Sequence, residues 1–155
     1  MRDNRFVAVH RGGPLTKDHH HQLIRWAREC SENLLSLIDE NIDQRLIRAL
    51  SVAKEWGKEK VTVGEARKAS VSAHAVARES SNPIIIAVAR SIGHAVATTH
   101  MADHSLGAAL YALKAVKNAG KSVDAERKWQ NKQLPSEIME LVLTAMSLKE
   151  KHFKI

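Results

Sequence analysis

The sequence predicts an all-α protein: a single domain of six or seven helices around a central apolar helix at about residues 83–102. Apolar residues recur at alternating steps of three and four along most of the chain, which is the period of a helix with one buried face. Residues that start or stop helices separate these runs, and no run alternates apolar and polar residues as a half-buried strand would. We therefore expect residues 1–155 to form one helical domain, with a less ordered basic segment at about 1–15.

The first two predicted helices carry regular apolar stripes. The first runs from about Lys17 to Ile38, with Thr16 as its N-cap. The second ends at Trp56, before Gly57, a residue suited to the left-handed conformation that ends many helices. The stripes consist of Leu23, Ala27, Cys30, Leu34 and Leu37 in the first helix, and of Ile42, Leu46, Ala49, Leu50 and Ala53 in the second.

The third predicted helix has the best-marked start. Thr62 and Glu65 have the spacing of a capping box, in which each side chain accepts a hydrogen bond from a backbone N–H of the first turn. Asn82 and Pro83 then cap and open the fourth helix, because proline costs nothing at the first helical position.

The fourth helix is apolar on nearly every side, so we expect it at the centre of the domain. It is about as long as a membrane span, but Arg90 and His94 lie in its middle, and we interpret it as the buried helix of a soluble protein. A fifth helix capped by Asp103 follows, unless the fourth and fifth helices are one bent rod. Two further helices are expected at about 123–131 and 135–149.

Cysteine content and net charge indicate the cellular compartment of the protein and the kind of partner that it binds. Cys30 is the only cysteine, which excludes an internal disulfide and fits a reducing cytoplasm, and the N-terminus lacks the apolar run of a secretory signal. The net charge of +7 favours an acidic partner or nucleic acid. We do not predict nucleic-acid binding, because the lysines are spread over several helices without interleaved aromatic residues.

The stretch "GHAVATTHMADH" at 93–104 gathers three histidines and an aspartate. On a continuous helix His100, Asp103 and His104 lie within about 60° of one another, whereas His94 points about 80° to 120° away from both other histidines. A metal site would need Asp103 as a third ligand, or a residue such as His74 from another helix. The alternative is a buried, hydrogen-bonded hinge between two helices.

A second polar feature lies on the third predicted helix, where Arg67, His74 and Arg78 line up beside Val71. Together with Arg90, these arginines are expected in or near apolar surroundings, where a guanidinium needs anionic or carbonyl partners. Two interpretations remain open: internal salt bridges, for instance to Asp103 or Glu126, or contact with an anionic ligand or partner.

The run "HHH" at 19–21 and the single cysteine carry no predicted chemistry. Three consecutive histidines point in three directions, so we expect a solvated helix start, to which His10 adds at most adventitious metal binding. Cys30 lies on an apolar stripe, where a thiol is usually inert. The sequence contains neither a phosphate-binding glycine loop nor a nucleophile elbow. We therefore predict no cofactor and, on balance, no enzymatic activity.

From about Trp26 to Val142, the order of the segments "WAREC", "GEARKA", "AHAVAR", "NPIIIAVARSIGHAVATTH" and "DHSLGAALYALKAV" resembles the immunity-five-like family of small helical prokaryotic proteins. The resemblance implies a cytoplasmic helical protein that neutralises a cognate toxin by binding it, and it supplies no catalytic residues. Many toxin-binding immunity proteins are acidic, so this basic chain suits a nuclease toxin with a cationic active site less well. The most diagnostic residues are Ala73, His74, Ala77, Arg78, Gly93, Ala97, Thr98, His100, His104, Tyr111, Ala112, Trp129, Gln130, Leu134 and Pro135.

Three hypotheses follow. The first is a non-enzymatic immunity-type protein that binds a protein toxin. The second is a metal- or small-molecule-binding helical protein that uses a cluster of His74, His100, Asp103 and His104. The third is a helical homodimer that associates through apolar surface around Trp129 and Phe153. Arg67 and Arg78 complete the candidate binding residues.

Overall fold

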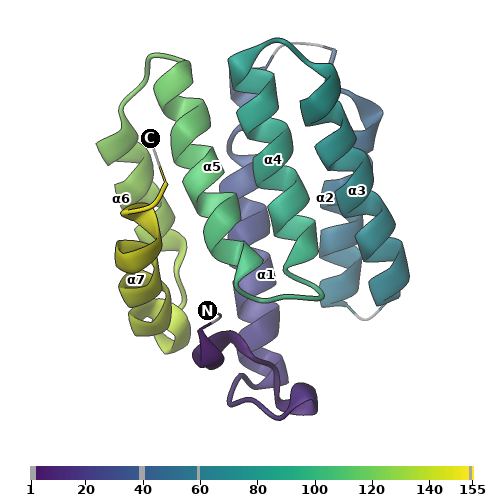
Figure 1. Cartoon of the computed structure of the whole chain (residues 1–155), viewed down its shortest axis with the longest axis vertical. Coiled ribbons are helices and arrows are strands. Elements are labelled where there is room, and N and C mark those ends of the chain that lie inside the picture. Colours follow the sequence, from purple (N-terminus) through teal and green to yellow (C-terminus); the bar gives the residue numbers. More distant parts are fainter. Residues whose placement is uncertain (1–2, 39–40, 59, 154) are drawn as a thin grey trace.

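The described parts of the chain, residues 3–38, 41–58, 60–153 and 155 of a computed structural model, fold into seven α-helices (Figure 1). They contain no β-strand, and a single isolated bridge joins Ala8 to Leu15. The predicted all-α class is therefore confirmed. The helices are α1 (Lys17–Glu32), α2 (Gln44–Gly57), α3 (Val63–Glu79), α4 (Pro83–Ala97), α5 (His104–Asn118), α6 (Val123–Gln133) and α7 (Ser136–Glu150), with short 3₁₀ turns at Asn4–Phe6, Val9–Arg11 and Leu35–Leu37.

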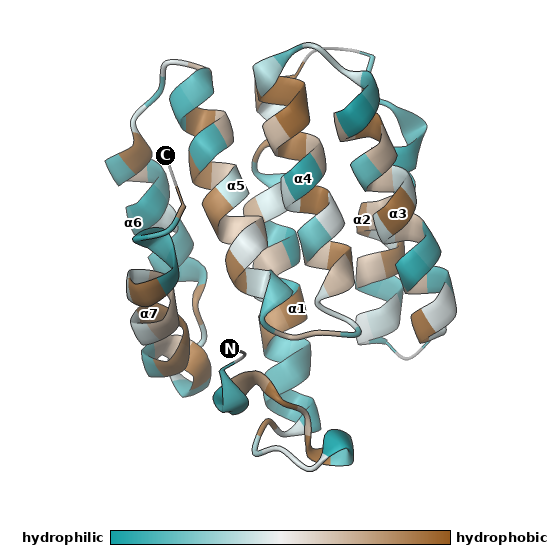
Figure 2. Ribbon diagram, in the orientation of Figure 1, coloured by the Kyte–Doolittle hydropathy of each residue, from teal (hydrophilic) through white to brown (hydrophobic). Residues whose placement is uncertain are grey.

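The apolar helix α4 lies at the centre of the bundle, as its sequence predicts. It contacts α1, α2, α3 and α5, and Figure 1 shows α3 and α5 flanking it while α1 and α2 lie behind. The helices α6 and α7 cover the far side of α5. Figure 2 shows apolar residues concentrated on the inner helices, whereas α6 is almost wholly hydrophilic. An amphipathic outer helix is stabilised by its packed face, and the all-round apolar helix by burial on every side.

Two apolar clusters form the core on either side of α4 and α5. One joins α2, α3, α4 and the C-terminal part of α5, and the other joins α1, α5 and α7 with Phe6 and Leu15. Where α1, α4 and α5 meet, small side chains allow close approach: Ser91 Oγ donates to the Ala108 carbonyl at 2.7 Å, so Ser31 Oγ donates to Ser91 Oγ at 2.8 Å. Each buried hydroxyl is thereby satisfied.

The predicted caps at Thr16, Thr62 and Asn82 agree with the structure. Thr16 accepts a hydrogen bond from the His19 N–H, and the capping box of Thr62 and Glu65 has both of its hydrogen bonds. Asn82 caps α4 with Pro83 in the first turn. These caps depend only on residues close in sequence, which is why the sequence locates them.

Two helix ends differ from the prediction. The first helix stops at Glu32 instead of Ile38, because Leu35–Leu37 tighten into a 3₁₀ turn. Gly57 is the last residue of α2 and has no positive φ, whereas Gly120, which follows α5, has φ +74°. Of these two glycines, only Gly120 takes the left-handed conformation.

The largest correction concerns the joint between α4 and α5. The predicted helix at about 83–102 ends at Ala97, and the alternative of one bent rod is wrong. After Ala97 the backbone N–H groups of Thr99 and His100 bond to carbonyls three residues back, which tightens the turn. Asp103 precedes α5, but its side chain makes no capping hydrogen bond. The helix α5 consequently folds back along α4 (Figure 1).

The segment of about 1–15, expected to be less ordered, contains two 3₁₀ turns within its described part. Phe6 and Leu15 are buried against α1, α5 and α7. The segment thus covers one end of the bundle (Figure 1). Among the described helices, none combines the length and apolar character needed to cross a membrane.

Candidate functional site

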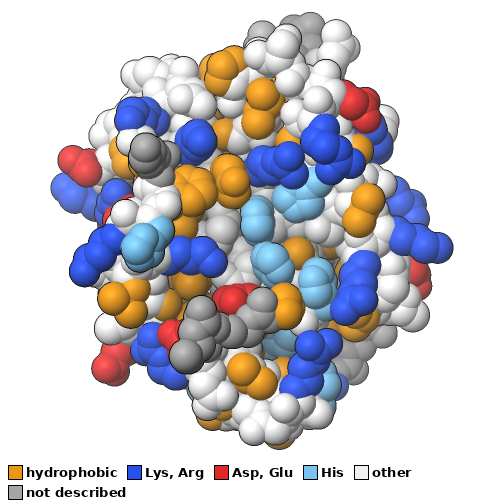
Figure 3. All heavy atoms as spheres, in the orientation of Figure 1, with side chains coloured by type: hydrophobic (Ala, Val, Ile, Leu, Met, Phe, Trp, Pro, Cys, Tyr) orange, Lys and Arg blue, Asp and Glu red, His pale blue; other side chains and the backbone are white. Residues whose placement is uncertain are grey.

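Four histidines form a row along one face of the bundle, and we call this row the histidine face. It runs from His74 on α3 through His94 on α4 to His104 at the start of α5 and His100 in the preceding turn. The ring centroids of successive pairs lie 5.3, 5.1 and 5.5 Å apart. Figure 3 shows imidazoles gathered in the middle of this face, with Lys and Arg side chains on both sides.

Two glycines make room for the rings. A Cβ atom on Gly93 would lie 2.6 Å from Cε1 and Nε2 of His74, and one on Gly107 would lie 2.8 Å from Nδ1 of His94. Real Cβ atoms do not approach other atoms so closely. The packing of α4 against α3 and α5 therefore depends on the absence of side chains at these positions. Sequence reasoning missed this role, although an isolated glycine inside an apolar helix is a signal of close packing.

Hydrogen bonds fix the protonation of His74. The Arg90 guanidinium donates to His74 Nδ1 at 2.8 Å, and a guanidinium has no acceptor, so Nδ1 is unprotonated. His94 Nδ1 and His104 Nδ1 lie 3.0 Å apart, so one of them donates to the other. The His94 ring also stacks on Tyr111, with centroids 5.3 Å apart.

Burial and positive charge keep the inner histidines neutral. Burial lowers the pKa of His94 to about 3, helped by His104, His74 and Lys149. Burial, together with the charge of Arg90 and its neighbours, lowers the pKa of His74 to about 4. His74 and His94 are thus neutral imidazoles among positive charges, which favours an anionic partner over a cation.

The structure brings His74, His100 and His104 into one row, but it also adds His94, which sequence reasoning excluded. The exclusion assumed a continuous helix, and it is wrong because α4 ends at Ala97 and α5 turns back. Asp103 lies at the foot of the row, half-buried, where it lines a cavity of about 120 Å³ together with His100 and residues of the N-terminal segment.

The arginines are arranged differently from the prediction. Arg67 and Arg78 are exposed on α3 rather than surrounded by apolar groups, and Arg90 pairs with an imidazole. Glu126, one of the two expected salt-bridge partners, accepts a hydrogen bond from the Asn33 side-chain amide at 2.8 Å. The interpretation that these arginines face an anionic partner stays open.

The predicted cluster of His74, His100, Asp103 and His104 does not form a compact set of metal ligands. Across the described ranges, three metal-ligating side chains have donor atoms within 4.8 Å of one another only at Asp18, His19 and Glu137, on the surface. Gln22 donates to both carboxylates of that trio, which ties the start of α1 to the start of α7. We interpret the trio as a surface contact between helix ends.

The expectation of a solvated "HHH" run is wrong for its middle residue. His20 is 6% exposed, and its Nε2 lies 2.6 Å from the Thr98 carbonyl, to which it donates. Burial lowers the pKa of His20. The rings of His20 and His21 each lie 5.2 Å from the Trp56 ring. The sequence did not show these contacts with Thr98 and Trp56, because both residues lie on other elements.

Cys30 is fully buried on α1, as its place on the apolar stripe predicts. Burial raises the pKa of its thiol well above the usual value. A buried thiol with a raised pKa is a poor nucleophile.

The fold and the histidine face define a small helical-bundle protein with a row of imidazoles along one face. The chain belongs to the Imm-5 like putative immunity protein family, whose model matches residues 13–137. This match includes α1 to α6 and the whole histidine face. Neither a curated protein nor a solved structure matches the chain.

Proposed function

We propose that this protein is a non-enzymatic immunity protein that acts in the cytoplasm and neutralises a cognate toxin by binding it directly. The family match over residues 13–137 is the observation that carries this proposal. Burial raises the pKa of the Cys30 thiol and makes it a poor nucleophile, which supports a non-enzymatic role.

We further propose that the toxin binds across the histidine face and the adjoining line of α3. Arg67 and Arg78 are exposed there, and Val71 between them is 63% exposed. An apolar contact flanked by guanidinium groups is the composition that favours a protein interface, since arginine binds carboxylates with two parallel hydrogen bonds. The partner surface would therefore be acidic, which agrees with the net charge of +7 on this chain.

Co-expression tests the proposal. The gene product encoded beside this one is expressed alone and together with this protein, and growth and copurification are measured. Rescue of growth with a stable complex is expected. Unaltered toxicity without any complex would contradict the proposed function.

Charge-reversal variants test the surface. The double variant Arg67→Glu and Arg78→Glu is expected to weaken the complex and abolish rescue, because like charges oppose each other across an interface. The matched control, Lys54→Glu and Lys128→Glu, changes the net charge equally at exposed positions of α2 and α6. Equal loss in both double variants would show that net charge, and not this face, determines binding.

A second candidate function is transition-metal binding through His94 and His104. Their Nδ1 atoms lie 3.0 Å apart, close to the separation of neighbouring ligands at bond lengths of about 2.0 Å. The positive surroundings oppose a cation. Metal analysis of protein purified without a tag, followed by titration with Co²⁺, decides between the two. A stoichiometric metal that is lost in His104→Ala would favour this second candidate.

A further inference from the structure

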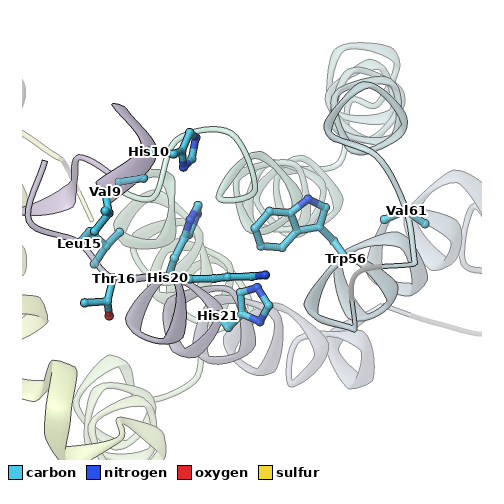
Figure 4. Close-up of a pocket in the computed structure, with 10 residues that line it drawn as sticks. Val9, His10, Leu15, Thr16, His20, His21, Trp56 and Val61 are labelled. Atoms are coloured by element: carbon cyan, nitrogen blue, oxygen red, sulfur yellow. The ribbon is translucent and has the colours of Figure 1, made fainter. Parts of the chain in front are cut away.

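A cavity outside the histidine face lies between the N-terminal segment, the start of α1 and the end of α2. Its volume is about 650 Å³, which is within the range of pockets that hold small organic molecules. Figure 4 shows His10, His20, His21 and Trp56 arranged around one space from these three parts of the chain. The other lining residues are Ala8, Val9, Leu15, Thr16, Lys17 and Val61.

The walls of this cavity suit a flat ring. Trp56 is half-buried, and two imidazoles lie at tilts of 54° and 56° to its ring, each with centroids 5.2 Å away. Leu15 is a buried apolar residue of the wall, and Val9 stands at the rim with 56% of its surface exposed. Aromatic surfaces arranged at such angles favour stacking and edge contacts with a further aromatic group.

The polar groups at the cavity favour a negative charge. Lys17 lines it, and the exposed His10 ring and the half-buried His21 ring are further polar groups of its wall. No carboxylate lines the cavity within the described ranges. A ligand with one anionic group would therefore complement this end of the cavity.

We propose that this cavity binds a small aromatic carboxylate, with its ring against Trp56 and Leu15 and its carboxylate toward Lys17 and the imidazoles of His10 and His21. The site is separate from the surface assigned to the toxin, so this proposal does not depend on the proposed function. A neutral aromatic compound would lose the charge contact, and an aliphatic acid would lose the stacking.

Calorimetric titration of the full chain tests this assignment. Indole-3-acetate is the probe, and indole-3-acetamide, which has the same ring without the charge, is the matched ligand control. The acid is expected to bind at least about tenfold more tightly than the amide. Cyclohexylacetate, which keeps the charge without the aromatic ring, is expected to bind more weakly than the probe.

A variant at the rim of the cavity tests whether the ligand binds there. Val9→Glu adds a negative charge at an exposed position and is expected to weaken indole-3-acetate binding at least about tenfold. Leu148→Glu, at a 59% exposed position on α7, is the matched control and should bind as the unmodified protein does. Absence of saturable binding, equal affinity for acid and amide, or unchanged affinity in Val9→Glu would overturn the proposal.

Discussion

The His74 ring of α3 packs directly against Gly93 of α4. This contact limits the size of the residue that fits at position 93. Gly93→Ala would place a Cβ atom 2.6 Å from the ring. We expect a loss of about 1 to 3 kcal/mol in the free energy of unfolding, because the ring must move and its bond to Arg90 is disturbed. Urea denaturation followed by circular dichroism measures this.

Gly57→Ala is the control for that substitution. No atom lies within 4 Å of a Cβ built there, and the residue is the last of α2. Alanine should be neutral there or stabilise the protein by up to about 1 kcal/mol. If both alanine variants had the same stability, the proposed crowding at Gly93 would be wrong.

The neutral histidines make stability depend on pH. The pKa of His94 is about 3 and that of His74 about 4 in the folded protein, whereas the ordinary value is 6.5. Between these values the unfolded chain binds protons that the folded chain does not. Stability is therefore full above pH 6.5 and falls as the pH drops toward 4. We expect a loss of about 1 kcal/mol or more per histidine from about pH 7 to about pH 5, measured by urea denaturation at each pH.

The variant His94→Gln separates this effect from general acid sensitivity. Glutamine does not titrate, so the pH dependence of its unfolding free energy should be shallower than that of the unmodified protein. The comparison uses the slope of the unfolding free energy against pH, so a loss of stability that is equal at every pH does not affect it. An unchanged slope would show that His94 binds protons equally in both states.

At the scale of the elements, the capping box of α3 is the most direct link between sequence and stability. Thr62 Oγ1 accepts from the Glu65 N–H at 3.1 Å, and the Glu65 carboxylate accepts from the Thr62 N–H at 3.2 Å. Thr62→Ala removes one acceptor at an exposed site. We expect it to cost about 1 kcal/mol of unfolding free energy, while Thr62→Ser, which keeps the hydroxyl, should lie within about 0.5 kcal/mol of the unmodified protein.

The α4–α5 turn decides which histidines meet. With the helix ended at Ala97, His94 and His104 face each other across two antiparallel elements, whereas one continuous helix would have separated them. The Thr98 hydroxyl donates to the His94 carbonyl at 3.0 Å, and the Thr98 carbonyl accepts from His20. These contacts join the turn to both α4 and α1.

At the scale of the whole molecule, the excess of positive charge gives the proposed complex a salt dependence. Attraction between a basic face and an acidic partner is screened by ions. We expect the affinity for the toxin to fall at least about tenfold between about 0.05 M and about 0.5 M NaCl, measured by titration at both salt concentrations. An affinity that did not change with salt would point to an apolar interface instead.

Self-association remains a prediction for the whole molecule. Phe153 is half-buried with its ring 4.9 Å from Tyr111, and Trp129 is also half-buried, so each offers less free apolar surface than the sequence alone indicated. Light scattering across a range of protein concentrations tests the homodimer. A mass that is independent of concentration and equal to that of one chain would contradict the homodimer.

The sequence by itself determined the fold class, the central place of α4 and most helix starts, including Thr16, Thr62 and Asn82. These features depend on the helical period and on bonds between residues a few positions apart, both of which are visible in one chain. Only the tertiary structure decided where α4 ends and that His94 joins His74 and His104. It also decided that His20 is buried, because its partners Thr98 and Trp56 come from distant segments. The physical reason is that such contacts depend on how packed helices turn and cross, and local periodicity carries no information on that.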